Sequence, residues 1–173
     1  MSTISKLITF GSAIPPQPPA SFVSYSDSGF IRTGGTSSGS FSVNAPSGIQ
    51  ENDFLIMVCL TPRAQTFPSA VSWSSSGFTS FETNYVQGAG KIQYFYKQAT
   101  ASEPSTYTVN WTFNGGFTPR HSAFILCFRD MSYGAHTSNY ASGVLTGSVT
   151  YMDVSAFSAS GDGVTIGLSL IHI

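Results

Sequence analysis

The chain has 173 residues, of which 41% are hydrophobic and only 9% are charged, and its formal net charge is −1. This length and apolar content suit one folded domain with a sizeable core and argue against an intrinsically disordered chain. The 7 lysine and arginine residues are scattered singly, so no basic stripe indicates a nucleic-acid partner. No apolar run approaches ~20 residues, so we expect no insertion into a membrane.

Residues 1–19 are expected to form an N-terminal arm and spacer that precede the domain. Lys6 to Ala13 faintly resembles a signal peptide, but a Thr and a Gly interrupt its short apolar run, which disfavours export by that route. Pro15-Pro-Gln-Pro-Pro19 is a stiff polyproline spacer that cannot join a central strand. The arm therefore either leads into the domain without a role of its own or docks on a neighbouring subunit.

From Ala20 onward, apolar residues alternate with polar ones, as in half-buried strands. The alternation is clearest from Tyr107 to Phe113, where Thr and Asn separate the larger side chains. Two stretches, 54–60 and 124–128, are apolar at nearly every position, which predicts two central strands buried on both faces. Weaker strand patterns follow at 145–151, 154–157 and 164–167.

Turn residues separate these segments at short intervals. Pro46-Ser-Gly48, the Ser-rich stretch between Trp73 and Phe78, and Glu103-Pro104 each predict a turn or loop. Asn52 precedes the first central strand where we expect a positive φ, which Asn tolerates. Short strands with turns about every 8–12 residues predict an all-β fold, a single antiparallel β-sandwich of jelly-roll or immunoglobulin-like type over residues 20–167.

The last residues, 168–173, are expected to be a non-native tail. Leu-Ser-Leu-Ile-His-Ile is what a common transposon-end sequencing adapter encodes when read as CTG TCT CTT ATA CAC ATC, which implies an assembled environmental read. The other interpretation is a natural final strand. If the tail is adapter-derived, the domain is truncated, and we expect an uncovered sheet edge or core with a liability to self-association.

Cys59 and Cys127 each lie inside a continuous apolar run. One interpretation is two buried free thiols, a common state for Cys. The other is an inter-sheet disulfide, because Trp73 lies between them as in the Cys-Trp-Cys order of immunoglobulin domains. The tyrosine expected two residues before the second Cys is replaced by Ile125, so the sequence favours free thiols.

No set of residues typical of an enzyme or a cofactor site stands out. The histidines, at 121, 136 and 172, show no metal-ligand spacing with the cysteines. The aspartates are isolated and form neither a carboxylate pair nor a calcium loop. We therefore expect a non-enzymatic protein with no metal and no cofactor.

Aromatic residues make up 14% of the chain and fall into two groups. The group at strand positions is predicted to be core: Trp73, Tyr94, Tyr107, Trp111 and Phe124. The group in irregular segments, with nearby basic residues, forms the candidate contact site: Phe30, Arg32, Phe117, Arg120, His121, Tyr133 and Tyr140. Loop aromatics beside polar residues can stack on the apolar faces of sugar rings, and loops on a rigid scaffold concentrate binding residues. The alternative is that they cover the ends of the sandwich.

The segments around the central strands also resemble a known family. The matching residues are Pro46-Ser-Gly48, Asp53, Trp73, Tyr94 to Lys97, Ala99 to Pro104, Tyr107, Trp111 and Phe128-Arg129. They resemble a β-sandwich domain of bacteriophage and prophage virion proteins, often described as tail-fibre-associated or decoration proteins. The resemblance covers roughly residues 40–130, and Asn52 departs from it where the family usually has Gly.

The resemblance implies a non-enzymatic structural or surface-adhesion protein of a phage virion, assembled in the bacterial cytoplasm. The expected partners are other virion subunits, further copies of this chain, and glycans of the host surface. The alternative is a carbohydrate-binding module of a secreted bacterial protein. The resemblance provides no catalytic residue, because its motifs are structural, and a fold by itself does not define a function.

Overall fold

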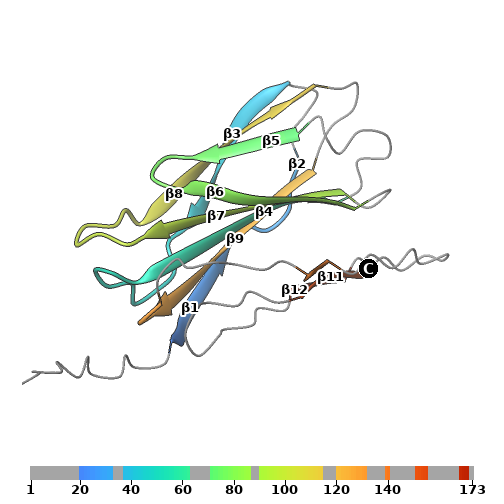
Figure 1. Cartoon of the computed structure of the whole chain (residues 1–173). Helices are drawn as coiled ribbons and strands as arrows, with labels where there is room; N and C mark the ends of the chain where they lie inside the picture. The colour runs from blue at the N-terminus through green and yellow to red at the C-terminus, as the bar shows by residue number, and fades with distance from the viewer. Residues whose placement is uncertain are drawn as a thin grey trace, which may run out of the picture.

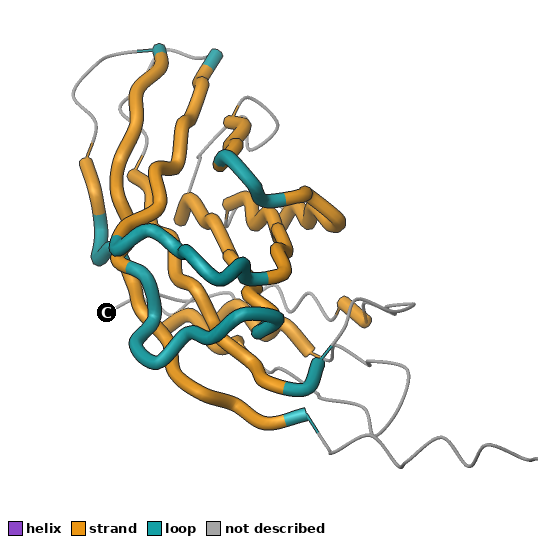
Figure 2. The backbone as a smooth tube through the Cα atoms, turned by 90° about the vertical axis from the view of Figure 1, so that its left-hand side faces the viewer, coloured by secondary structure: helices purple, strands orange, loops and turns teal. Residues whose placement is uncertain are grey.

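The computed structural model describes residues 20–32, 37–62, 71–86, 90–114, 120–131, 139–140, 151–155 and 168–171. Figures 1 and 2 show that this part of the chain is built of strands and connecting loops, with no helix among the described residues. Two antiparallel sheets pack face to face. The predicted all-β sandwich is thus confirmed.

The larger sheet has the strand order β1-β9-β4-β7-β6, and the short strand β2 also pairs with β9. Both predicted central strands lie inside this sheet, because β4 is flanked by β9 and β7, and β9 is flanked by β1 and β4. The bounds are β1 Ser21–Asp27, β2 Ile31–Arg32, β4 Phe54–Pro62, β6 Thr79–Val86, β7 Gly90–Gln98 and β9 Arg120–Arg129.

The smaller sheet has the order β3-β8-β5, with bounds β3 Ser38–Asn44, β8 Thr106–Phe113 and β5 Val71–Ser75. The pairing is nested, because β1 pairs with β9, β3 with β8 and β4 with β7. The chain alternates between the sheets as it winds inward and back out, which is the winding of a jelly roll. Strands β6 and β7 break this alternation, because they follow each other in the chain and pair with each other in the larger sheet.

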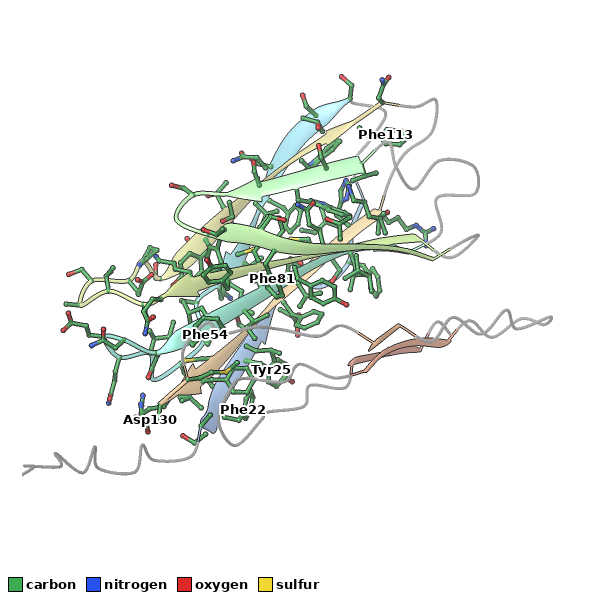
Figure 3. The ribbon with its side chains drawn as sticks, viewed as in Figure 1. Phe22, Tyr25, Phe54, Phe81, Phe113 and Asp130 are labelled. Carbon is green, nitrogen blue, oxygen red and sulfur yellow. The ribbon has the colours of Figure 1, made fainter. Side chains whose placement is uncertain are left out.

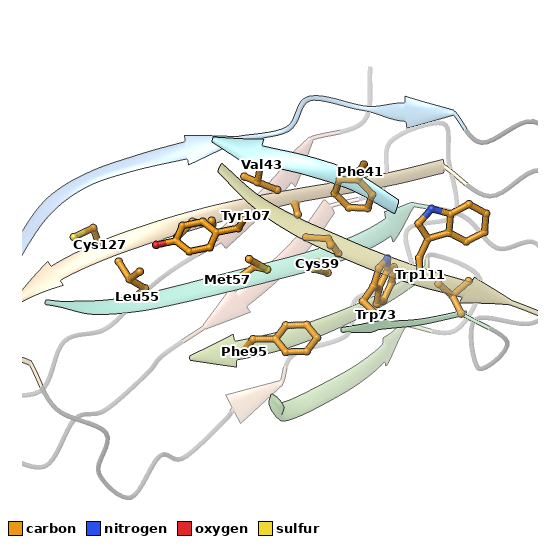
Figure 4. Packing of buried hydrophobic residues seen from close by; sticks show 14 of the residues in the cluster. Phe41, Val43, Leu55, Met57, Cys59, Trp73, Phe95, Tyr107, Trp111 and Cys127 are labelled. Atoms are coloured by element: carbon orange, nitrogen blue, oxygen red, sulfur yellow. The ribbon is translucent and has the colours of Figure 1, made fainter. Parts of the chain in front are cut away.

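The core between the sheets is formed by the inward residues of both layers (Figure 4). Strand β8 shows the alternation most clearly: its inward residues are buried and those between them are exposed. From the larger sheet, Leu55, Met57, Cys59, Phe95 and Ile125 meet this face. The predicted core aromatics Trp73, Tyr94, Tyr107 and Trp111 are all buried, and Phe124 is partly buried.

The other face of the larger sheet is also apolar. Its buried residues are Phe54, Ile56, Val58, Leu60, Ile92, Tyr94, Phe128 and Met131. Strand β4 therefore contributes apolar side chains to both faces, which explains why residues 54–60 lack the alternation seen in β8. This strand matches the pattern expected of a central strand buried on both faces.

The cysteines are free and fully buried, as the sequence favoured. Both lie in the larger sheet, where Cys127 is opposite Leu55 and Cys59 is opposite Ala123. Cys59 is four residues along β4 from Leu55, the residue opposite Cys127, which is a spacing of about 13 Å along the strand. A disulfide needs Cα atoms within about 7 Å, so the inter-sheet disulfide is excluded by the strand register.

The two ends of the sandwich differ. At one end, which we name the tight-turn end, the described turns 45–53, 76–78 and 99–105 connect the strands. Figure 2 looks onto this end, and Figure 1 has it on the left. The predicted positive φ of Asn52 is confirmed at 71° and lies in the first of these turns. The chain also enters and leaves the sandwich here, because Ser21 is paired with Arg129.

The opposite end, which we name the loop end, is bounded by Arg32, Ser38, Pro62, Val71, Gly90, Phe113 and Arg120. Their register partners agree: Arg32 is opposite Arg120, Pro62 is opposite Gly90, and Val71 is opposite Phe113. Four connections leave the strands at this end, at 33–36, 63–70, 87–89 and 115–119, which lie outside the described residues. In Figure 3, Phe113 lies at this end, whereas Phe22 and Asp130 lie at the tight-turn end.

A separate three-stranded sheet follows, with the order β10-β11-β12. Its bounds are β10 Asn139–Tyr140, β11 Tyr151–Ser155 and β12 Leu168–Ile171. Strand β11 overlaps two of the weaker strand predictions, and the rest of those predictions lies outside the described residues. Residues 168–171, expected to belong to a non-native tail, pair with β11.

Candidate functional site

Two carboxylates of the tight-turn end, Asp53 and Glu103, organise hydrogen-bond networks. Asp53 is the centre of the first. Arg129 donates from Nε and Nη2 to the two Asp53 oxygens, at 2.9 Å each. The Gln50 backbone N–H donates to Asp53 Oδ2 at 2.8 Å, a contact within the turn that precedes β4. Burial alone would raise the pKa of Asp53, but the hydrogen bonds from Arg129 and Gln50 outweigh it and lower this pKa.

Glu103 is the second centre and organises the turn 99–105. Its carboxylate accepts hydrogen bonds from Lys97 Nζ at 2.6 Å, the Thr100 backbone N–H at 2.7 Å and the Tyr107 hydroxyl at 2.7 Å. Burial alone would raise the pKa of Glu103, but these hydrogen bonds lower it to about 2. A carboxylate held ionised by so many donors is a structural group, because it lacks the raised pKa of a general acid.

The loop end brings together four of the seven candidate contact residues. Ile31 is opposite His121 and Arg32 is opposite Arg120, so the segment before β3 and the start of β9 lie side by side. Phe30 precedes this pair and is 63% exposed, and Arg120 is exposed as well. The sequence proposed these residues as one group, and the strand register gives the physical reason.

His121 does not have the position that the sequence suggested. It was expected in an irregular contact segment, but it lies in β9 and is fully buried. The reason is the period-2 alternation of β9, which puts His121 in phase with the inward residues Ala123, Ile125 and Cys127. His121 therefore cannot contact a ligand at the surface as predicted.

The described part of the chain does not place the other three candidates at this end. Phe117 and Tyr133 lie outside the described residues. Tyr140 belongs to β10, where it is opposite Val154 of β11, and thus to the separate sheet rather than to the sandwich. The structure therefore groups Phe30, Arg32 and Arg120, with His121 beneath the surface.

His121 is the centre of a buried aromatic cluster below the loop end, formed with Phe41, Trp73 and Trp111. Its ring stacks on Phe41 with centroids 6.1 Å apart and lies 4.7 Å from the Trp111 ring. Trp73 donates its Nε1–H to His121 Nδ1 at 3.3 Å. Burial lowers the pKa of His121 to about 4, so the ring is neutral near pH 7.

The Trp73 contact fixes the tautomer of this imidazole. An indole N–H is only a donor, so His121 Nδ1 must be the acceptor and the proton of the neutral ring is on Nε2. Within the described part of the chain, neither His121 Nε2 nor Trp111 Nε1 has a hydrogen-bond partner. The cluster thus contains two buried N–H donors and no acceptor for them.

Lys91 is a buried cation that the sequence reasoning missed. It lies at the start of β7, donates from Nζ to the Val71 carbonyl, and has Nζ 5.5 Å from the centre of a Trp73 ring. Burial lowers its pKa. The alternation of strand β7 could have indicated its burial. Lys91 and Phe95 are an even number of residues apart, so their side chains point to the same face of the sheet, and Phe95 faces the core.

The sequence contains one Gly-x-Ser-x-Gly spacing, at Gly35-Thr-Ser-Ser-Gly39, the pattern of the nucleophile elbow of α/β-hydrolases. The elbow requires a strand-to-helix turn, whereas Ser37 leads directly into strand β3. Ser37 also uses its backbone carbonyl to accept from the Phe113 N–H at 2.7 Å. This spacing therefore does not indicate a hydrolase.

Among the described residues, no group of three His, Cys, Asp or Glu side chains could hold a metal ion. Nor does this part of the chain include a helix long and apolar enough to cross a membrane. Comparison of the chain with protein-family models, with curated proteins and with solved structures finds no match.

Proposed function

We propose that this chain is a non-enzymatic adhesion module of a phage virion, and that it contacts glycans through its loop end. The proposal is supported by the positions of two features of the sandwich: the ends of the domain lie at one end, and the exposed candidate contact residues lie at the other. The chain enters and leaves the sandwich at the tight-turn end, where Ser21 is paired with Arg129. The exposed Phe30 and Arg120 lie at or near the other end.

This arrangement suits a module that is anchored at one end and presents the other. Strands of a packed sandwich give a rigid support, and binding residues concentrate on the segments between them. At the tight-turn end, the carboxylates of Asp53 and Glu103 accept hydrogen bonds from neighbouring groups of the same chain. Phe30, by contrast, exposes most of its ring to solvent and is free to stack on the apolar face of a sugar.

A single ring–sugar contact is weak, so affinity for one glycan is expected to be about millimolar, or ~4 kcal/mol. Display of many copies on one particle raises the effective strength by about 10²-fold or more. The proposal thus predicts binding that is measurable only when the module or the glycan is multivalent. The phage setting itself is tested by the flanking genes, since terminase, capsid or tail genes beside this one would support it.

The test is a glycan array probed with the chain displayed in many copies on a bead. Phe30→Ala should abolish the signal, and Phe22→Ala is the matched control, because Phe22 is similarly exposed, at 56%, but lies in β1 at the tight-turn end. Loss of signal in both variants, or in neither, would show that the loop end is not the contact surface. No binding by the unaltered chain would remove the adhesive function and leave a purely structural one.

A further inference from the structure

We infer that the ligand of the loop end is an acidic saccharide, a sugar that carries a carboxylate. The inference rests on the proposed function and specifies its ligand class. It starts from a register pair of like charges: Arg32 and Arg120 are directly opposite each other on β2 and β9. Like charges in such a cross-strand pair are destabilising unless a counter-charge is present.

The described part of the chain supplies no such counter-charge at the loop end. Its acidic residues lie elsewhere: Glu51, Asp53, Glu103 and Asp130 belong to the tight-turn end, Asp27 is opposite Phe124, Glu82 is opposite Tyr94 on the far edge strand β6, and Asp153 belongs to the separate sheet. Phe124 is four residues along β9 from Arg120, about 13 Å. Arg120 has no ion-pair partner among the described residues, whereas the corresponding arginine at the other end of β9, Arg129, is paired with Asp53.

The interior beneath the loop end also contains a basic side chain and N–H donors, as its surface contains arginines. Lys91 is buried just inside it, and the two buried N–H groups of Trp111 and His121 have no acceptor among the described residues. These groups do not reach the surface, but charges and dipoles beneath a surface contribute to the potential above it. Surface and interior therefore both favour an anion at this end.

The chemical class of the anion follows from the neighbouring side chain. Guanidinium groups bind planar carboxylates through two parallel hydrogen bonds, and they are weakly hydrated compared with an ammonium. Phe30, two residues before Arg32, adds an exposed aromatic face. A uronic or sialic acid offers both matching parts on one ring, a carboxylate for the arginines and apolar C–H groups for the phenyl ring.

The experiment compares acidic and neutral sugars that are otherwise alike. The multivalent full chain is titrated at about 0.15 M salt with trigalacturonate against trigalactose, and with sialyllactose against lactose. We expect at least one acidic sugar to bind about 10-fold or more tightly than its neutral counterpart, because a hydrogen bond to a charged group is worth more than a neutral one. Arg120→Gln and Arg32→Gln should each remove this preference. Lys6→Gln removes the same charge before the polyproline spacer and should leave the preference intact.

Three outcomes overturn the inference, and they are separable from failure of the proposed function. Equal binding of neutral and acidic sugars would remove the acidic class while leaving adhesion in place. Equal binding of heparin and single-stranded DNA would show attraction to charge alone. A preference that survives Arg120→Gln, with the circular dichroism spectrum unchanged, would place the anion elsewhere. Absence of binding to every sugar would instead overturn the proposed function itself.

Discussion

Trp73 and His121 join the two sheets through a single hydrogen bond, from the indole Nε1–H to imidazole Nδ1 at 3.3 Å. Trp73 lies on β5 of the smaller sheet and His121 on β9 of the larger one. Both side chains are buried, so the bond forms without competition from bulk water. It requires a neutral imidazole, which makes the packing of the sandwich sensitive to pH.

Acid should destabilise the domain through His121. Its pKa is about 4 in the folded chain, against 6.5 for an ordinary histidine, so the unfolded state binds more protons between these values. Stability should therefore fall as the pH is lowered from about 6.5 to about 4, by on the order of 3 kcal/mol in total. Urea unfolding at pH 7 and pH 5 measures the first part of this loss, about 2 kcal/mol. His121→Gln should be less stable at pH 7 but lose less on acidification; an equal loss in both proteins would contradict the assignment.

Asp53→Ala should destabilise the domain by about 2 kcal/mol, because a buried carboxylate that accepts several hydrogen bonds is removed. The turn before β4 should lose its order first, since the Gln50 N–H loses its acceptor. Urea unfolding gives the free energy, and hydrogen exchange of the amides at 48–53 gives the location. Glu51→Ala, an exposed neighbour, is the control and should change stability little. Unchanged exchange in this turn would refute the account of Asp53.

Gly39→Ala should destabilise the domain although Gly39 is on an edge strand. Gly39 is opposite Trp111, and a Cβ there would lie 2.9 Å from indole Cζ2. Trp111 is buried within the aromatic cluster and cannot move aside freely, so we expect a cost of about 1–3 kcal/mol. Thermal unfolding and the near-ultraviolet circular dichroism of the two buried tryptophans test this. Ser40→Ala, at the next and exposed position, should have a much smaller effect.

The two thiols should be unreactive and unbonded in the native protein. Burial raises the pKa of Cys59, and burial together with the neighbouring Asp53 charge raises the pKa of Cys127 to about 12. Neither thiolate is available for alkylation near neutral pH. Iodoacetamide should modify both cysteines only after unfolding, as mass spectrometry can show. A mass increase on treatment of the native protein with reductant would instead reveal a disulfide and contradict the strand register.

The sequence was sufficient for the fold class because most apolar segments have a clear period. The alternation of residues 107–113 and the apolar run 54–60 could each be assigned to a face or to a central strand before any pairing was known. The Asp53–Arg129 pair could not be predicted in this way, because 76 residues separate its members and only the β4–β9 register brings them together. Long-range contacts of this kind depend on topology, which alternation does not determine.

The candidate site was only partly predictable for the same reason. Phe30, Arg32 and Arg120 were identified from composition, but their proximity follows from the pairing of β2 with β9. His121 was misplaced because its neighbours Arg120 and Ser122 are polar, although the alternation of β9 already included it. Lys91 was missed because a buried lysine is rare, and its burial here follows from the Val71 carbonyl that accepts its hydrogen bond.

The central claim is that ligand contact occurs at the loop end and not at the tight-turn end. Amide chemical shifts of the isotopically labelled full chain, followed by NMR during titration with trigalacturonate and sialyllactose, test it most directly. We expect shifts at Phe30 to Arg32 and at Arg120 to Ser122, which the register places side by side. Shifts confined to the turns 45–53 and 99–105 would contradict the account, because they would place the ligand at the tight-turn end.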